Sequence, residues 1–329
     1  MAQLVTILGG SGFVGRYIAR RMAQAGWRVR VAVRRPEQAG FLRTYGVVGQ
    51  VEPLLCNIRD EASLRAVIRG ADAVVNCVGI LSESGKNRFD AVQGKGPGLA
   101  ARIAAAEGVG RFVQISAIGA DAGSDSAYAR SKAEGEAAVM AAFPAAVILR
   151  PSIIFGAEDQ FFNRFAGMAR MAPVLPIAHG GTKFQPVWVD DVAQAAAKVV
   201  LEGAEPGIYE LGGPEVQSFR ELMAMMLAEI RRRRLIFVMP RFMARIAAGS
   251  FDLLQTVSFG LFHNGVLTRD QLKNLARDNV VSDGAKGFAD LGIAPMPMAL
   301  VLPDYLWRHR PTGQYDAIRE SARGLGQGQ

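Results

Sequence analysis

The sequence predicts an α/β protein, with a doubly wound parallel sheet covered by helices and a smaller C-terminal α+β cap domain. Strand-like and helix-period segments alternate through the first half, as expected of parallel strands joined by helices. The runs 73–78 and 112–115 are apolar apart from one polar residue each, which is typical of strands buried on both faces. The expected strands span 3–8, 28–33, 51–56, 72–77, 111–116 and 145–149.

The alternation breaks after Pro151, where frequent prolines separate shorter elements. Helices are expected at about 190–202, which starts on two aspartates, and at about 218–229, which starts on a serine. The expected organisation is a core over 1–150, a cap region over 151–310 whose late strands and helices interleave with the core, and a flexible tail over 311–329.

Composition narrows the class of protein. Of the 329 residues, 50% are hydrophobic and 21% charged, which indicates a globular chain. No apolar run approaches the roughly 20 residues of a membrane span, and the chain starts directly on a strand, so neither a transmembrane span nor a signal peptide is expected. The net charge of +8 comes without a nucleic-acid module, so no nucleic acid is expected. Cys56 and Cys77 are expected to be small buried residues, with no disulfide or metal site.

A glycine-rich loop joins the first strand to the first helix. Its spacing is G-x-x-G-x-x-G, where glycines permit a tight turn and a close approach of the pyrophosphate to the backbone. The helix N-terminus adds free amide donors and the positive end of its dipole. The alternative is tight strand–helix packing without a ligand. The position favours a Rossmann-type dinucleotide site, with cofactor contacts at Gly9, Gly12, Phe13, Val14 and Gly15.

The end of the second strand selects the cofactor. An enzyme that uses NAD usually places an acidic residue there, whereas this chain has Arg34 and Arg35. Two guanidinium groups suit a 2′-phosphate, and Arg16 supplies a possible third donor. The alternative is that both arginines are simply solvated. The sequence therefore predicts NADPH in preference to NADH.

Further motifs resemble the extended, atypical branch of the short-chain dehydrogenase/reductase superfamily. Residues 56–60 resemble its D-h-R-D segment, with Asn57 in place of the first acid, and 76–79 resemble its N-x-A-G element. Residues 128–132 match Y-x-x-x-K, and 150–156 resemble the strand beside the nicotinamide. The resemblance implies further cofactor contacts at Asn57, Ile58, Val78, Gly79, Ser116, Tyr128, Lys132, Pro151 and Ile154.

Motifs in the second half narrow the resemblance. Residues 185–193, 209–214, 278–281, 291–293 and 302–306 are similar to the accessory subunit nine of the alpha subcomplex of respiratory complex I, the NADH:ubiquinone oxidoreductase, and to its bacterial relatives. Such relatives are often described as NAD-dependent epimerase/dehydratase-like. The resemblance implies an NADPH-binding, non-catalytic accessory or assembly subunit. It further implies peripheral association with the cytoplasmic side of a bacterial inner membrane.

The catalytic pair of the superfamily is present, but its third member is not. Tyr128 and Lys132 lie four residues apart, so they share a helix face, as acid/base chemistry requires. By analogy with the family, a hydroxyl should stand near Ile118, and Ser116 replaces it only if the register shifts. Either the pair is vestigial and clamps the cofactor ribose, or the chain is a free-standing NADPH-dependent reductase or epimerase of a small carbonyl or quinone-like substrate.

A long apolar stretch lies beyond the fold motifs. Residues 239–264 carry many large apolar side chains at partly helical spacing and follow the basic run 231–234. A core helix is one interpretation. Docking on a membrane surface or on a partner is the other. The resemblance favours docking and names subunits of the complex I peripheral arm as partners.

Overall fold

The computed structural model describes residues 2–240, 242–243, 269–313 and 315, and it confirms the α/β class. Seven parallel strands form one sheet in the order β11-β6-β5-β4-β1-β2-β3. Strand order reverses on either side of β1 and β4, so their carboxyl ends flank a switch point of the sheet. The strands are Leu4–Leu8 (β1), Arg28–Val33 (β2), Val51–Leu55 (β3), Ala73–Asn76 (β4), Arg111–Ile115 (β5), Val147–Pro151 (β6) and Gly207–Leu211 (β11).

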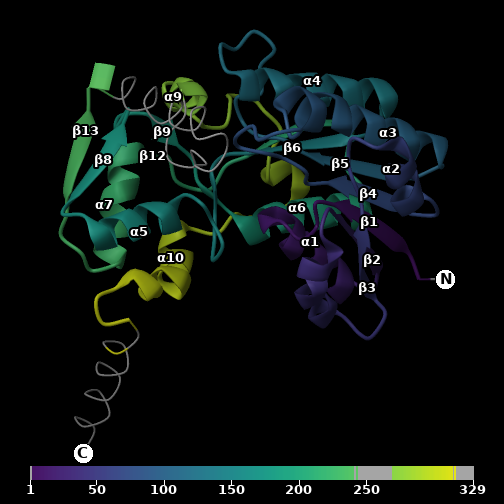
Figure 1. The fold of residues 1–329 in the computed structure, drawn as a ribbon, viewed down its shortest axis with the longest axis horizontal. Helices are drawn as coiled ribbons and strands as arrows, with labels where there is room; N and C mark the ends of the chain where they lie inside the picture. Colours follow the sequence, from purple (N-terminus) through teal and green to yellow (C-terminus); the bar gives the residue numbers. More distant parts are fainter. Residues whose placement is uncertain (1, 241, 244–268, 314, 316–329) are drawn as a thin grey trace, which may run out of the picture.

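Helices cover both faces of this sheet (Figure 1). Helices α1 and α6 pack together on one face, while α2, α3 and α4 pack on the other. An ion pair between Arg21 of α1 and Asp190 of α6, with a 2.7 Å N–O distance, joins the first helix to the second half of the chain. The helices are Phe13–Gln24 (α1), Glu61–Ile68 (α2), Gly96–Ala106 (α3), Ala127–Ala142 (α4) and Val189–Glu202 (α6), with a 3-10 helix at Pro36–Tyr45 (η1) and a π-helix at Asp90–Lys95 (η2).

The cap has its own apolar core beside the sheet domain, rich in phenylalanine. Phe161 contacts four other phenylalanine rings, with centroid distances of 5.0 to 6.3 Å. Helix α7 begins at a complete capping box between Ser218 and Glu221, as its starting serine predicts. The cap elements are Ile154–Phe155 (β7), Phe162–Met171 (α5), Val174–Ala178 (β8), Lys183–Phe184 (β9), Val187–Trp188 (β10), Gln217–Ser218 (β12), Phe219–Glu229 (α7), Leu235–Met239 (β13), Arg269–Leu275 (α9), Ala289–Leu291 (η3), Met298–Leu306 (α10) and Trp307–His309 (η4).

Cap and core are interleaved along the chain. Strand β7 pairs with β10, β12 with β9, and β13 with β8, whereas α6 and β11 return to the large sheet. Most of 239–264 and of 311–329 lies outside the described residues. Within the described ranges, no helix is both long enough and apolar enough to cross a membrane.

Candidate nucleotide-binding site

The glycine loop places an open helix N-terminus at the carboxyl end of β1. Gly9 has a left-handed φ of +75° and donates from its amide to Ala32 of β2, which turns the chain toward α1. Helix α1 begins after Gly12 with no side-chain cap and no acidic residue in its first turn. Its first amide donors are therefore available to an anion, which the helix dipole also favours.

Gly12 and Gly15 have different structural roles in this loop. A Cβ on Gly15 would lie 2.6 Å from both Gly10 Cα and Gly9 O, so Gly15 permits the helix to approach the loop. A Cβ on Gly12 would meet only Gly9 O, at 3.1 Å, and Gly12 is exposed and lines a cavity. A side chain at Gly12 would therefore enter the space in which a pyrophosphate would lie.

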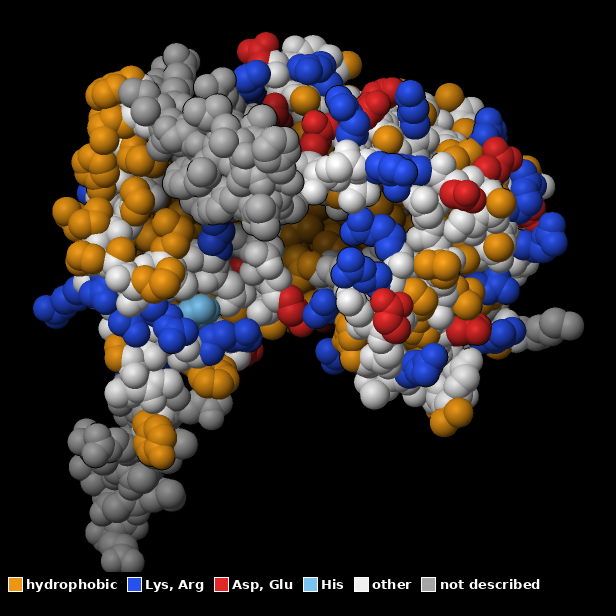
Figure 2. Space-filling model, in the orientation of Figure 1, with side chains coloured by type: hydrophobic (Ala, Val, Ile, Leu, Met, Phe, Trp, Pro, Cys, Tyr) orange, Lys and Arg blue, Asp and Glu red, His pale blue; other side chains and the backbone are white. Residues whose placement is uncertain are grey.

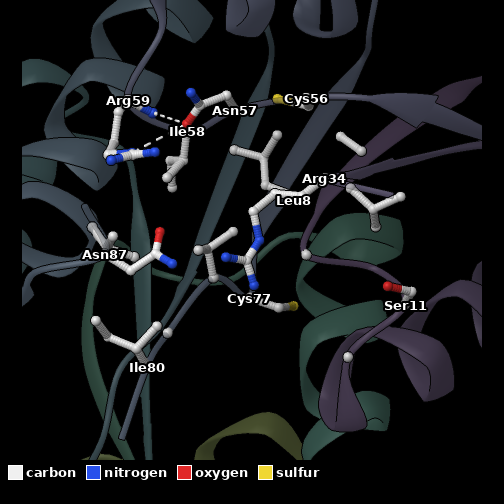
Figure 3. Close-up of a pocket in the computed structure, with 17 residues that line it drawn as sticks. Leu8, Ser11, Arg34, Cys56, Asn57, Ile58, Arg59, Cys77, Ile80 and Asn87 are labelled. Carbon is white, nitrogen blue, oxygen red and sulfur yellow. Dashed lines mark hydrogen bonds between the residues drawn. The ribbon is translucent and has the colours of Figure 1, made fainter. Parts of the chain in front are cut away.

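A cavity of about 210 Å³ opens beside this loop, between the ends of β1 to β4 (Figure 3). Its apolar walls come from side chains such as Leu8 and Ile80, and its polar groups include Asn57 and Asn87. Asn57 Oδ1 accepts hydrogen bonds from the Arg59 amide, at 3.2 Å, and from Arg59 Nε, at 3.3 Å. Of the contacts expected from the sequence, Gly9, Gly12, Arg34, Asn57, Ile58, Val78 and Gly79 line this cavity.

The arginines expected near the cofactor lie in different positions. The Arg34 guanidinium extends into the cavity, whereas Arg35 is exposed before η1 and does not line it (Figure 3). Arg16 donates to the carbonyl oxygens of Ser11 and Gly12 and pairs with Glu158 at 3.2 Å, so it braces the glycine loop. The position of Arg34 therefore supports it as a phosphate ligand, whereas Arg16 is already paired with Glu158.

Sequence reasoning missed several cavity residues. Arg59 lines the cavity, and its Nη1 is held by the Lys86 carbonyl at 2.6 Å. Arg59 belongs to residues 56–60, which resemble the D-h-R-D segment, so this resemblance could have indicated it. Cys56 and Cys77 also line the cavity, and Cys77 is only partly buried, so the expectation of two small buried cysteines is wrong for Cys77. The remaining lining residues that were missed are Leu8, Ser11, Ala32, Val33, Ile80, Asn87 and Val92.

Lys132, which the sequence predicts to hold the ribose next to the nicotinamide, lies beside Gly79 of the cavity wall. It is buried on α4, and a Cβ on Gly79 would lie 3.5 Å from its Nζ. Burial lowers the pKa of Lys132 to about 8, while nearby Glu136 and Cys77 act in the opposite direction. Glu136 is itself buried and paired with Arg150, which also pairs with Glu210 at 3.5 Å. Lys132 is thus a buried amine whose charge depends on its neighbours, as expected of a ribose-binding or catalytic lysine.

Tyr128 is placed one helical turn before Lys132. Its ring packs edge-on against Phe89 at a centroid distance of 5.9 Å, and Lys132 Nζ lies 5.9 Å from the ring centroid of Tyr128. Burial raises the pKa of Tyr128 to about 12, so the phenol stays protonated at neutral pH. The structure therefore brings the expected Tyr–Lys pair together, with a protonated tyrosine and a buried lysine.

The hydroxyl at the end of β5 belongs to Ser116. Its Oγ is buried and has no hydrogen-bond partner among the described residues, so it is a free polar group that a bound ligand could satisfy. Ile118, at the position expected for a catalytic hydroxyl, is buried, and its carbonyl accepts from Asn279 Nδ2 at 3.2 Å. The uncapped start of α1, the open space beside Gly12 and the Ser116 hydroxyl are all features that a bound dinucleotide could use. The residues present therefore fit a dinucleotide.

The other expected residues lie outside the described cavity. A Cβ on Gly156 would lie 3.4 Å from the Phe13 ring, which places the turn after β7 beside the start of α1. Pro151 ends β6 and accepts from the Ile118 amide, while Ile154 pairs with Val187. The expected contacts that do not line the cavity are Phe13, Val14, Gly15, Arg16, Arg35, Ser116, Tyr128, Lys132, Pro151 and Ile154, and their part in cofactor binding stays a prediction.

A late segment, residues 270–279, crosses the loop before α4. Asp270 accepts from Ser126 Oγ at 2.7 Å, from the Ala127 amide at 2.9 Å and from the Tyr128 amide at 3.2 Å. Further along, Lys273 donates to the Asp125 carbonyl at 3.1 Å, and Arg277 pairs with Asp121 at 3.3 Å. This segment therefore fastens the loop that leads into Tyr128, a contact that no sequence motif indicated.

These features define a dinucleotide-binding protein of the Rossmann type that carries a reductase-like Tyr–Lys pair. The chain belongs to the NAD dependent epimerase/dehydratase family, whose model matches residues 5–212, more than half of the chain. The chain is similar over nearly its whole length to subunit 9 of the NADH dehydrogenase [ubiquinone] 1 alpha subcomplex. The mitochondrial protein of Arabidopsis thaliana is 35% identical over 316 residues, which cover 94% of this chain and 79% of the relative.

One further relative is a reductase by name, and one solved structure of similar fold is an oxidoreductase by name. The ceramide reductase of Caulobacter vibrioides is 35% identical over 210 residues, 63% of this chain and 64% of that protein. A solved NADPH-dependent quinone oxidoreductase of Escherichia coli, complexed with NADPH, superposes with a TM-score of 0.69 over 92% of this chain and 98% of that chain. Its identity of 20% shows a shared fold.

Proposed function

We propose that this chain holds NADPH as a structural cofactor and serves as an accessory or assembly subunit of respiratory complex I. The observation that carries the proposal is an asymmetry of the site. The cofactor half has its glycine cradle, Arg34 and Lys132, whereas the substrate half lacks a hydroxyl at Ile118 and is crossed by residues 270–279. Similarity to complex I subunits along nearly the whole chain supports the same function.

The proposed function also implies where in the cell the protein lies. A subunit of this kind in a bacterium would lie peripherally on the cytoplasmic side of the inner membrane, against subunits of the peripheral arm. The sequence segment 239–264 is the proposed contact, although most of it lies outside the described residues.

A reductase is the second candidate, and one observation favours it. Tyr128 and Lys132 share one face of α4 at the spacing that acid/base chemistry requires, and perturbed pKa values such as that of Lys132 cluster at functional sites. Bound NADPH would supply a hydride. Tyr128 would then provide the proton, and Lys132 would hold the ribose. Loss of one positioned hydrogen-bond donor typically slows such chemistry about 100- to 1000-fold, so residual turnover is compatible with Ile118.

The decisive experiment compares complex I from membranes that contain wild type, Tyr128→Phe or Lys132→Ala. We expect each protein to be captured by affinity purification, with complex I subunits as the readout. Tyr128→Phe should co-purify normally and support normal complex I activity, whereas Lys132→Ala should retain less nucleotide. In single-turnover assays at about 340 nm, NADPH should stay reduced with carbonyl and quinone substrates. Fast NADPH oxidation that is lost in Tyr128→Phe would instead establish the reductase.

Cofactor choice gives a separate prediction. Wild type should bind NADPH more tightly than NADH, because the Arg34 guanidinium in the cavity can pair with a 2′-phosphate. Arg34→Ala should remove a charge-assisted contact of roughly 1.5–3 kcal/mol for NADPH and leave NADH almost unchanged. Arg35→Ala, outside the cavity, is the matched variant and should have a smaller effect. Titration of each protein with both nucleotides measures this, and equal wild-type affinities would contradict the assignment.

A further inference from the structure

The cap exposes an apolar surface around β13, which we call the β8–β13 face. Strand β13 pairs only with β8 among the described strands, in a parallel register that places Leu235 beside Val174. Leu235 is 66% exposed, Phe237 41% and Val174 38%, and Met171 just before β8 is 85% exposed. Figure 2 shows hydrophobic side chains gathered on the edge of the cap where Figure 1 places β13 and β8. A contiguous apolar surface of this kind marks a contact site, unlike isolated exposed leucines.

Arginines border this face on one side. Arg231 to Arg234 directly precede β13, and Figure 2 shows basic side chains gathered below the apolar area. From Ile230 to Phe251 the sequence contains six arginines and no acidic residue. Arg232 donates to the His309 carbonyl and Arg234 to the Ala169 carbonyl, contacts that fix the two side chains without neutralising them.

Positive charges lie close together near this border. Burial, and then the charges of Arg170, Arg308 and Arg232, lower the pKa of His309. Among the described residues, the Nε atoms of Arg232 and Arg234 donate to carbonyl oxygens rather than to acidic side chains. The border therefore has the charge that phosphate groups require.

We propose that the β8–β13 face docks on an anionic phospholipid surface. Leu235, Phe237 and Met171 would enter the boundary between headgroups and acyl chains, while the arginine border would pair with lipid phosphates. An apolar surface bordered by a run of arginines fits many mobile phosphates, whereas a protein partner would be expected to require a fixed pattern of both charges. The inference deepens the proposed function, because it names the face through which a complex I subunit would meet the bilayer.

The test uses the full chain loaded with NADPH and two kinds of vesicle. One is phosphatidylcholine alone, and the other is phosphatidylcholine mixed with phosphatidylglycerol. Co-sedimentation should show binding to the mixed vesicles, weakened by salt, and little binding to the neutral ones. Leu235→Ser combined with Phe237→Ser should reduce the bound fraction at least tenfold. Arg233→Gln should reduce it about fivefold, which corresponds to roughly 1 kcal/mol per basic residue near such a surface.

Matched variants keep the test specific. Leu300→Ser changes an equally exposed cap leucine, 64% exposed on α10, and Arg43→Gln removes an exposed arginine from the sheet domain; both should bind vesicles as wild type does. Circular dichroism and bound nucleotide verify that each variant is folded. No wild-type binding to the mixed vesicles, equal binding to neutral ones, or equal losses in the matched variants would overturn the lipid assignment. Co-purification with complex I subunits is measured separately, so it distinguishes failure of this surface from failure of the proposed function.

Discussion

Valine in place of Gly12 is expected to abolish dinucleotide binding and leave the fold intact. Gly12 has a φ of −70°, which any residue adopts, and a Cβ there meets only Gly9 O, at 3.1 Å. The two γ-methyl groups would enter the space beside the helix N-terminus and push the pyrophosphate away. Loss of two phosphate contacts, each about 1.5–3 kcal/mol, corresponds to a loss of roughly 100-fold or more in affinity.

The neighbouring glycine supplies the comparison. At Gly15 even an alanine places Cβ 2.6 Å from Gly10 Cα, so α1 must move away from the loop. We expect Gly15→Ala to lower the thermal unfolding midpoint, whereas Gly12→Val should unfold near the midpoint of the nucleotide-free wild type. Circular dichroism melting and nucleotide released on denaturation measure both effects. A folded Gly12→Val protein with a full complement of nucleotide would contradict the site.

Alanine in place of Asp270 is expected to destabilise the start of α4 and so to disturb the position of Lys132, the proposed ribose ligand. The carboxylate accepts three hydrogen bonds there, from Ser126 Oγ and from the amides of Ala127 and Tyr128. Its loss should cost about 2–3 kcal/mol of stability, since hydrogen bonds to charged groups are among the stronger ones. Lys132 follows on the same helix, so nucleotide retention should fall while the glycine loop stays formed.

Asp283→Ala is the matched control, because Asp283 is an exposed aspartate in the same late part of the chain. It should change neither the unfolding midpoint nor the nucleotide content. Denaturant titration with and without NADPH separates the two expected effects of Asp270→Ala. If that variant and the control behave alike, Asp270 does not support the helix.

The sheet and the phosphate end of the site could be predicted because their determinants are local. Each of the six expected strands is found within a few residues of its expected ends, and most are short apolar runs, although β2 and β3 include charged residues. The glycine spacing fixes the loop within seven residues, and Gly12 lines the cavity as that spacing predicts. Arg34 lines it as its place at the end of the second strand predicts. The helix Phe219–Glu229 begins after the expected Ser218, whereas Val189–Glu202 begins at Val189 and carries the expected aspartates inside its first turn.

The substrate side could not be predicted, since its contacts join residues far apart in the sequence. Ser126 and Asp270 are 144 positions apart, and neither lies in a motif that would suggest the pair. Arg59 lines the cavity because the Asn57 side chain and the Lys86 carbonyl hold it there, which a linear pattern does not encode. In this chain, hydrogen bonds between residues far apart in the sequence fix the loop before α4 and the position of Arg59.

The contact between Asp270 and α4 also sets an order of events during synthesis. Synthesis proceeds from the N-terminus, so the glycine loop and the first four strands leave the ribosome long before residue 270. The amides of Ala127 and Tyr128 therefore lack the carboxylate of Asp270 until translation is well advanced. Nucleotide captured before that point would be held at its phosphates first and at its nicotinamide ribose last.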